Sequence, residues 1–381
     1  MKVFDLFCGT GGFSKGMENS KQANFDVKLG IDVLPASVET FKLNHRAGIG
    51  ICKDIRQLRR HEVEEITGVK RDQLDVLVGG PPCQGFSSIR PFRSSKEDDP
   101  RNSLFEEYAS FVNYFRPKVF ILENVVGLAT HKGGTTLEKM QDCFKKIGYE
   151  TDWKLLNAAH FGVPQKRERF VMIGVQKGGK ILFPTPTHFY KGSTIGYRDK
   201  VRILAPREPD LFEEQILTDA LSAMDAISDL PPISSGEIAS EYSMPPQNQY
   251  QKDRRESSEI LELHIATAHS NKMLEIVKHS GKNINCIPKH LITSGFSSCY
   301  SRLDADHPAV TITVNFVHPA SNRCIHPVLD RALTPREGAR LQSFDDTFQF
   351  FGTRTQITKQ IGNAVPPLLG TAIGETVAEM F

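Results

Sequence analysis

The sequence predicts an α/β fold, a doubly wound and mostly parallel sheet with a smaller, irregular domain inserted before the C-terminal helices. Residues 1–180 alternate short apolar runs with stretches of helix-spaced apolar residues, which is typical of a parallel sheet covered by helices on both faces. From about Pro184 to His326 the chain becomes polar and rich in turn-forming residues, and helical patterns return after that. We therefore expect one domain of residues 1–183 plus 327–381, interrupted by a second domain of residues 184–326.

The expected strands and helices follow one another along the first domain. Runs rich in Val, Ile, Leu and Phe are predicted to be buried strands: KVFDLF, KLGID, LDVLVGG, KVFILENV and ERFVMIGV. Helices are expected between them at Phe13–Asn19, Ala36–Asn44 and Leu104–Phe115, and a short strand at Ala309–Asn315. The last helices begin at Pro335 and at Pro366–Pro367, because the first turn of a helix leaves its amides unpaired and tolerates proline.

Composition limits the class of protein. The chain has 381 residues, of which 39% are hydrophobic and 24% charged, so a wholly disordered chain does not fit. No apolar run is long enough to span a membrane, and the N-terminus MKVFDLFCG does not resemble a signal peptide. The net charge of +2 means that any nucleic-acid contact must come from local patches. Seven scattered cysteines, without CxxC or HExxH, predict neither disulfides nor a metal site. We expect a cytoplasmic protein.

The first predicted strand leads into the glycine-rich segment FDLFCGTGGFS. Gly9, Gly11 and Gly12 lie where a strand turns into a helix, so the backbone there can approach a ligand closely. Asp32 closes the second strand and Asp54 follows the next apolar run, where carboxylates can accept hydrogen bonds from ribose hydroxyls. The glycines alone would also fit a tight structural turn. Because GTGGFS lacks the third glycine of GxGxxG, the pattern favours S-adenosylmethionine over NAD as the cofactor.

Cys83 differs from the other cysteines in its surroundings. The segment LDVLVGGPPCQGFS places it in a loop stiffened by Pro81 and Pro82, at the carboxyl edge of the sheet where open α/β folds bind ligands. A thiol attacks as the thiolate, so its pKa must fall from about 8.5, which a nearby cation or loop amides can achieve. A lone cysteine is usually an inert packing residue, but this setting favours a nucleophile.

Two further motifs point to the same edge of the sheet. KVFILENV ends in Glu123 and Asn124, and a carboxylate at the end of an apolar strand is expected to be a desolvated proton donor. The alternative is a structural acid that caps the following helix. QKRERF places Arg167 and Arg169 before the strand Phe170–Val175, where alternate residues of extended backbone can share a face. A solvated run of charges is the alternative for these arginines.

Taken in order, these motifs resemble the cytosine-5 DNA methyltransferase family from one end of the chain to the other. The matching segments are DLFCGTGG, Asp32, Asp54-Ile55, GGPPCQGFS, RNSLF, ENV, QKRERF, RALTPREGARLQSF and QIGNAVPP. The segment from about Pro184 to His326 resembles the variable target-recognition region of that family, and TITVNF resembles the strand that follows it.

The resemblance implies a covalent mechanism, because cytosine C5 is a poor nucleophile until a thiolate adds at C6. Cys83 would be that thiolate, Glu123 would bind N3 and the exocyclic amine, Arg169 would contact O2, and Arg167 would set the loop and stabilise charge near the sulfur. The target base must be flipped out of the duplex. Gln84 and the segment Phe86–Arg101 are candidates for closing over it.

The resemblance also implies a set of cofactor-binding and DNA-binding residues. The S-adenosylmethionine pocket would be lined by Phe7, Gly9, Gly11, Asp32, Val33, Asp54, Ile55, Pro82, Leu104 and Asn363. The product would be S-adenosylhomocysteine, with no metal involved. Candidates for reading base edges are Arg254, Arg255, Asn283 and Arg302, with a solvated surface role as the alternative. The expected partner is double-stranded DNA, with a cognate restriction endonuclease acting separately, and the expected state is a monomer.

Competing functions differ in identifiable motifs. A tRNA cytosine-5 methyltransferase shares the scaffold, but its relatives usually have a proline after PPCQ and a CFT tripeptide, whereas Gly85 follows Gln84 here and CFT is absent. A catalytically inactive DNA-binding homologue would not need Cys83, Glu123 and Arg169. A Rossmann dehydrogenase would need GxGxxG. The recognition sequence itself cannot be deduced from these motifs.

Overall fold

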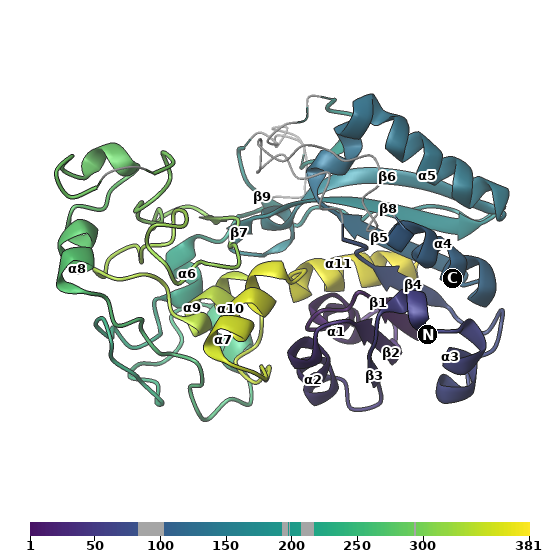
Figure 1. Ribbon diagram of the computed structural model, residues 1–381, viewed down its shortest axis with the longest axis horizontal. Coiled ribbons are helices and arrows are strands. Elements are labelled where there is room, and N and C mark those ends of the chain that lie inside the picture. Colours follow the sequence, from purple (N-terminus) through teal and green to yellow (C-terminus); the bar gives the residue numbers. More distant parts are fainter. Residues whose placement is uncertain (83–102, 193–196, 198, 207–216, 293–294) are drawn as a thin grey trace. The chain divides into compact units, whose positions relative to one another are not determined.

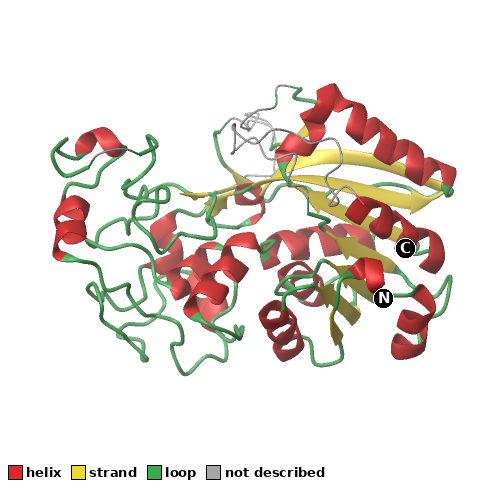
Figure 2. Cartoon of the chain, viewed as in Figure 1, coloured by secondary structure: helices red, strands yellow, loops and turns green. Residues whose placement is uncertain are grey.

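The computed structural model describes the chain except for residues 83–102, 193–196, 198, 207–216 and 293–294. Cys83, Gln84 and the segment Phe86–Arg101 therefore lie outside the described residues. The chain divides into two compact units. The first unit comprises Met1–Phe161, Glu168–Ile216 and Pro367–Phe381, and the second comprises Gly162–Arg167 and Leu217–Pro366. Figure 2 shows a sheet with helices in the first unit, and short helices joined by long loops in the second.

The first unit contains an eight-stranded sheet with the order β10-β6-β8-β5-β4-β1-β2-β3. The strands are β1 (Lys2–Leu6), β2 (Asp26–Asp32), β3 (Ile49–Cys52), β4 (Val76–Gly79), β5 (Val119–Asn124), β6 (Tyr149–Asn157), β8 (Glu168–Gln176) and β10 (Ile203–Leu204). β3, β2, β1, β4 and β5 run parallel, while β8 lies antiparallel to both β5 and β6. The predicted α/β class with a mostly parallel sheet is confirmed.

Helices surround this sheet (Figure 1). They are α1 (Gly12–Glu18), α2 (Pro35–Asn44), α3 (Arg60–Thr67), α4 (Ser103–Phe115), α5 (Thr135–Lys146) and α11 (Pro367–Ala378), with short 3-10 turns η1 (Ile55–Gln57), η2 (Val126–Gly134) and η3 (Ala158–Phe161). A two-residue strand, β9 (His188–Phe189), follows β8. Aromatic rings from α4, α5 and β5 form much of the core, for example Phe120 against Phe144 with centroids 4.2 Å apart. No described helix has the length and apolar character needed to cross a membrane.

The second unit is built from short elements. They are β7 (Gln165–Lys166), β11 (Thr218–Asp219), α6 (Ala223–Ile227), α7 (Gln249–Arg255), α8 (Asn271–Lys278), η4 (Ile284–Cys286), β12 (Ala309–Val310), α9 (Pro335–Leu341) and α10 (Arg354–Asn363). β7 and β12 pair in parallel. Of the strand expected at Ala309–Asn315, only β12 forms. Residues 327–366, which the sequence assigned to the first domain, pack within the second unit, and α11 alone of the C-terminal helices packs in the first.

The backbones of α11 and α1 pack directly against each other, because glycines lie on both helices at the contact. A Cβ built on Gly16 would lie 2.0 Å from the Pro367 carbonyl oxygen, and one on Gly370 would lie 2.4 Å from the Phe13 carbonyl oxygen. The Thr371 hydroxyl donates to the Gly16 carbonyl at 2.8 Å, which satisfies a polar group at this dry contact. The C-terminal residues of the chain thus hold the helix that follows the glycine-rich turn.

Candidate functional site

The strand registers bring the predicted site segments to one edge of the sheet in the first unit. Leu6 pairs with Ile31 and with Gly79, and Gly79 pairs with Leu122. The residues that follow these positions, namely 7–12, 32–33, 80–82 and 123–124, therefore leave adjacent strands at the same end. Asp32 pairs with Cys52, so Asp54 and Ile55 also follow at this edge. Carboxyl ends of parallel strands are where open α/β sheets bind ligands.

The glycine-rich turn after β1 has a backbone that few side chains tolerate. Phe7, Gly9 and Gly11 have φ angles of +59°, +52° and +78°. A Cβ built on Gly9 would meet no atom of the described residues within 4 Å, so the backbone at Gly9 is open to a ligand. Gly11, in contrast, faces inward, where a Cβ would lie 2.4 Å from His45 Nε2. The turn therefore has one side open to a ligand and one side packed on the protein.

Asp32 fixes this turn relative to β2. Its Oδ2 accepts from the Gly9 amide at 2.9 Å and its Oδ1 accepts from the Leu34 amide at 2.9 Å. Burial raises the pKa of the Asp32 carboxyl, although the two amide hydrogen bonds oppose the shift. Each carboxylate oxygen still has a second lone pair, so Asp32 can also accept from ribose hydroxyls.

The remaining predicted cofactor residues of the first unit differ in exposure. Asp54 caps η1 and binds Arg56, whose Nη2 lies 2.6 Å from Oδ2, and this hydrogen bond lowers the pKa of Asp54. Ile55 is buried, whereas Val33 is 62% exposed and offers apolar surface to a ligand. Phe7 and Leu104 are partly buried against the core, and Pro82 is exposed. Asn363 ends α10 in the second unit and is exposed there.

Glu123 and Arg169 form an ion pair at this edge. The register of the antiparallel pair β5 and β8 places the end of β5 beside the start of β8. Arg169 Nε lies 2.6 Å from Glu123 Oε1, and the side chains are 14% and 13% exposed. Glu123 does not cap the following 3-10 turn, since the residue before η2 is Val125 and no side chain caps it. The structural alternative for Glu123, a helix cap, is therefore not what the chain uses.

The backbone that leads to Cys83 lies against this ion pair. A Cβ built on Gly80 would lie 2.9 Å from Glu123 Oε2, and the Asn124 side-chain amide donates to the Pro81 carbonyl at 3.0 Å. Cys83 itself lies outside the described residues. Cys8, another cysteine at this edge, is buried, and burial raises the pKa of its thiol well above the ordinary value. Cys8 is thus unsuited to act as a thiolate.

Arg167 has a different environment from Arg169. It falls between β7 and β8, so the strand alternation expected for QKRERF does not extend across it. The guanidinium is 1% exposed and donates to the carbonyls of Ile312 at 3.3 Å and Gly362 at 3.1 Å, all within the second unit. Gln165 binds there as well, donating to Gln342 at 2.9 Å. The two arginines therefore have different partners, since Arg167 binds backbone carbonyls of the second unit and Arg169 pairs with Glu123.

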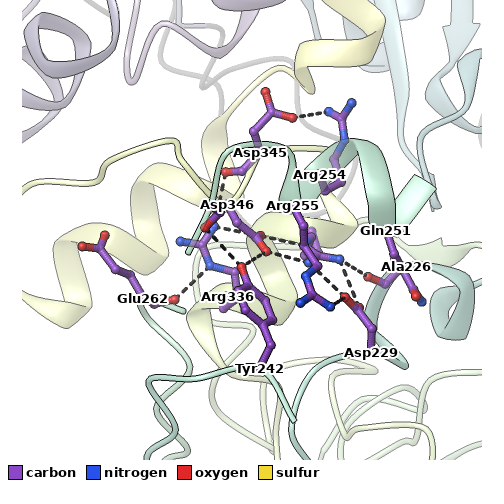
Figure 3. A network of polar contacts seen from close by, with 12 residues as sticks. Ala226, Asp229, Tyr242, Gln251, Arg254, Arg255, Glu262, Arg336, Asp345 and Asp346 are labelled. Carbon is purple, nitrogen blue, oxygen red and sulfur yellow. Dashed lines mark hydrogen bonds and ion pairs between the residues drawn. The ribbon is translucent and has the colours of Figure 1, made fainter. Parts of the chain in front are cut away.

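The candidate base-reading residues are used for contacts inside the second unit. Arg254 pairs with Asp345 at 2.8 Å, and Arg255 lies over the Tyr242 ring while contacting Asp229 (Figure 3). Arg302 donates to the carbonyls of His326 and Leu329, and Asn283 caps η4. The three guanidinium groups have partners within the unit, so they are not freely solvated, and their part in reading bases stays a prediction. Figure 3 shows the network around Arg336 and Asp346 to which Arg254 and Arg255 belong.

Sequence reasoning missed a buried polar group beneath the glycine-rich turn. Asp5 on β1 accepts from the Ser14 hydroxyl at 2.6 Å, and His45 Nε2 lies 3.2 Å from the Gly11 carbonyl oxygen. All of these side chains are at most 3% exposed. An aspartate within the apolar run KVFDLF was the only available signal, since a buried acid requires a partner. Among the described residues, no cluster of His, Cys, Asp and Glu is arranged to hold a metal ion.

Comparison with known proteins gives consistent matches over the whole chain. The C-5 cytosine-specific DNA methylase family matches residues 1–379. The type II methyltransferase M.AgeI of Thalassovita gelatinovora is 33% identical over 99% of both chains, and M1.HphI of Haemophilus parahaemolyticus is 36% identical over 100% of this chain and 87% of its own.

Solved structures match in fold over the whole chain as well. A DNA modification methyltransferase encoded within a prophage of E. coli superposes with a TM-score of 0.73 and 24% identity, covering 100% of this chain and 99% of that one. The Dnmt2 methyltransferase of S. pombe superposes with a TM-score of 0.59 and 16% identity, covering 100% and 98% of the two chains. At these identities the structural matches concern the fold.

Proposed function

Because this chain belongs to the C-5 cytosine-specific DNA methylase family and is a DNA cytosine-5 methyltransferase, we propose that Cys83, Glu123 and Arg169 form its catalytic centre. The observation that carries the proposal is the Glu123–Arg169 ion pair, which lies against the backbone at Gly80, three positions before Cys83. The strands β4, β5 and β8 bring Gly80, Glu123 and Arg169 to one sheet edge, and Cys83 follows Gly80 three positions later in the sequence. This arrangement can bind a planar heterocycle by its edge and attack it from one side.

The proposed reaction begins with the thiolate of Cys83 adding to C6 of a flipped-out cytosine, which makes C5 nucleophilic. Glu123 gives a proton to N3 and accepts a hydrogen bond from the exocyclic amine, and Arg169 donates to O2, so that the negative charge of the adduct is neutralised. N3 returns this proton to Glu123 when the thiolate leaves. S-adenosylmethionine, when bound, supplies the methyl group that C5 accepts. A base then removes the C5 proton, and the Cys83 thiolate leaves as the C5–C6 double bond re-forms. Arg167 is proposed to set the backbone before β8 through its contacts with the carbonyls at 312 and 362.

The family implies use of S-adenosylmethionine, and the residues at the edge fit that group. Gly9 leaves its backbone open, Asp32 keeps lone pairs for ribose hydroxyls, and the exposed Val33 side chain offers an apolar contact for an adenine ring. We propose that these residues hold the cofactor together with Phe7, Gly11, Asp54, Ile55, Pro82, Leu104 and Asn363.

The catalytic proposal is tested with Cys83→Ala and with a trapping substrate. Cys83→Ala is expected to abolish methylation while leaving S-adenosylmethionine binding unchanged. DNA with 5-fluorocytosine at the target position is expected to form a covalent complex that survives denaturant, because fluorine cannot leave as a proton. Gel electrophoresis under denaturing conditions measures the complex. An active enzyme that forms no such complex would contradict the thiolate route.

We propose in addition that residues 184–326 recognise the DNA sequence and that the enzyme acts as a monomer in a restriction–modification system. The restriction–modification setting is supported by the names of M.AgeI and M1.HphI, which are type II methyltransferases. The role of residues 184–326 rests on their resemblance to the variable region of the family. Sequencing the methylated cytosines in DNA from cells that express the protein identifies the recognised sequence. Methylation spread over cytosines in every sequence context would contradict this proposal while leaving the catalytic one intact.

A further inference from the structure

A chain of buried polar contacts lies beneath the glycine-rich turn of the first unit. The Ser14 hydroxyl donates to Asp5 Oδ2 at 2.6 Å and lies 3.4 Å from His45 Nε2. His45 Nδ1 lies 3.1 Å from Glu18 Oε2, which also accepts from Lys15 at 3.2 Å. The chain therefore joins β1, α1 and the end of α2. None of these groups has a part in the catalytic proposal above.

His45 makes the contact that reaches the turn itself. Its Nε2 lies 3.2 Å from the Gly11 carbonyl oxygen, which also accepts from the Lys15 amide at 2.8 Å as the first hydrogen bond of α1. The Ser14 hydroxyl, which donates to Asp5, also lies 3.2 Å from the Gly11 carbonyl oxygen. Because a carbonyl oxygen can only accept, the contact between His45 Nε2 and Gly11 is a hydrogen bond in the tautomer that carries its proton on Nε2.

The shape of the turn depends on the same ring. A Cβ on Gly11 would lie 2.4 Å from His45 Nε2 and 2.7 Å from the Phe41 ring, and the two rings stack with centroids 4.3 Å apart. His45 is 1% exposed, so its ring fills the space directly under the turn. Removing the ring would take one of three partners from the Gly11 carbonyl, which also accepts from the Lys15 amide and the Ser14 hydroxyl, and would leave a hole beneath a backbone with positive φ.

The glycine-rich turn contains a buried polar group that the described residues do not hydrogen-bond. Thr10, between Gly9 and Gly11, is 2% exposed, and its hydroxyl has no hydrogen-bond partner among the described residues. A buried hydroxyl without a partner costs free energy of about 1–3 kcal/mol. A polar ligand that reaches this hydroxyl would remove that cost.

We propose that His45 is a positioning residue for S-adenosylmethionine, holding the Gly11 carbonyl so that the turn is preformed when the cofactor arrives. The inference rests on the proposed cofactor pocket. His45 does not touch the reacting atoms, so its effect is on cofactor affinity and not on the chemical step. A preformed turn raises affinity because the cost of ordering it is met during folding.

The test compares His45→Ala and His45→Gln with a stability control, Val63→Ala, which opens a hole in the core of the same unit at a residue that is 0% exposed. We expect His45→Ala to raise the dissociation constant and KM for S-adenosylmethionine at least tenfold. The kcat at saturating cofactor and the KM for DNA should stay within threefold of the parent enzyme. His45→Gln, whose amide can donate to the Gly11 carbonyl, should recover most of the affinity. Calorimetry gives the dissociation constant and steady-state assays give kcat and KM.

The results separate this inference from the proposed function. If His45→Ala binds the cofactor as tightly as Val63→Ala does, or if kcat falls as much as affinity, His45 is not a positioning residue. If His45→Gln folds but binds S-adenosylmethionine no more tightly than His45→Ala, His45 is likewise not a positioning residue. If His45→Ala does not fold, Glu18→Gln is tested in its place. We expect this variant to raise the dissociation constant at least twofold, and an unchanged dissociation constant would contradict the proposal. Failure of the parent enzyme to bind S-adenosylmethionine would instead contradict the proposed pocket.

Discussion

At the residue scale, the position of the Glu123 carboxylate depends on Arg169, a partner 46 positions away in the sequence. Its side chain is 13% exposed at the end of an apolar strand, where a carboxylate needs a partner to offset the free-energy penalty of desolvation. Arg169 Nε at 2.6 Å offsets that penalty and orients the carboxylate toward the edge of the sheet. Glu123 is thus fixed by a partner before any substrate binds, and a base that enters the site meets both groups in a defined geometry.

Replacing the carboxyl of Glu123 tests its chemical role. We expect Glu123→Gln to lower kcat for DNA methylation by about 100-fold or more, in the range typical of lost acid–base groups. Glu107→Gln is the matched control, because Glu107 also pairs with an arginine, Arg60, in the first unit, with side chains 26% and 14% exposed. The control should keep kcat within twofold. Equal losses in the two variants would show that the ion pair is structural.

At the element scale, the last helix completes the unit that holds the turn. α11 lies far from α1 in sequence, yet glycines on both helices allow their backbones to touch. α11 packs against α1, the helix that begins at the glycine-rich turn. The stability of α11 is therefore coupled to that of the proposed cofactor site. Only a residue without a Cβ permits this separation.

The helix pair predicts contrasting effects of two identical substitutions. Gly16→Ala gains helix propensity of up to about 1 kcal/mol, but its Cβ would lie 2.0 Å from the Pro367 carbonyl oxygen. Because that atom is backbone, we expect a net loss of about 1–3 kcal/mol in the free energy of unfolding. A Cβ on Gly374 would lie 3.2 Å from Met17 Cα, so Gly374→Ala should change the free energy of unfolding by less than about 1 kcal/mol. Urea unfolding measures both, and equal values would refute this packing.

At the scale of the whole molecule, buried titratable groups make stability depend on pH. The first unit contains groups of both signs, since burial lowers the pKa of His131, His160 and His188 there. In the second unit burial lowers the pKa of His326 to about 4, and its Nδ1 accepts from the amides of Val328 and Leu329. Burial also lowers the pKa of His264 and of His269. In the first unit burial raises the pKa of Asp5 to about 7.

These shifts predict the sign of each pH dependence. Unfolded histidine has a pKa of about 6.5, so the unfolded second unit takes up protons first and the unit loses stability as pH falls from about 6.5 to about 4. Glu337, with a pKa lowered to about 2 chiefly by the charge of Arg331 against the opposing effect of burial, adds a loss below about pH 4.5. Asp5 acts the other way, since the proton that it holds in the folded state is lost as pH rises through about 7.

Urea unfolding between pH 7.5 and pH 4.5 checks the prediction. We expect the transition of the second unit to move to lower urea concentration as the solution becomes acidic, and His326→Gln to reduce that movement. Asp5→Asn should instead stabilise the first unit most at pH 7.5, where the folded protein has lost most of the Asp5 proton. A second unit whose stability does not change between pH 6.5 and 4.5 would contradict the assigned burial of these histidines.

The sequence by itself determined the α/β class, the strands β1, β2, β4, β5 and β8, and the edge at which Asp32, Asp54 and Glu123 emerge. These features follow from patterns between neighbouring residues, namely apolar runs that end in glycine or acid. Only the tertiary structure decided that Arg169 pairs with Glu123, that Arg167 is buried in the other unit, that the arginines of the polar region are held inside it, and that His45 supports the turn. A side chain's partner and burial are set by segments distant in sequence, and no local pattern carries that information.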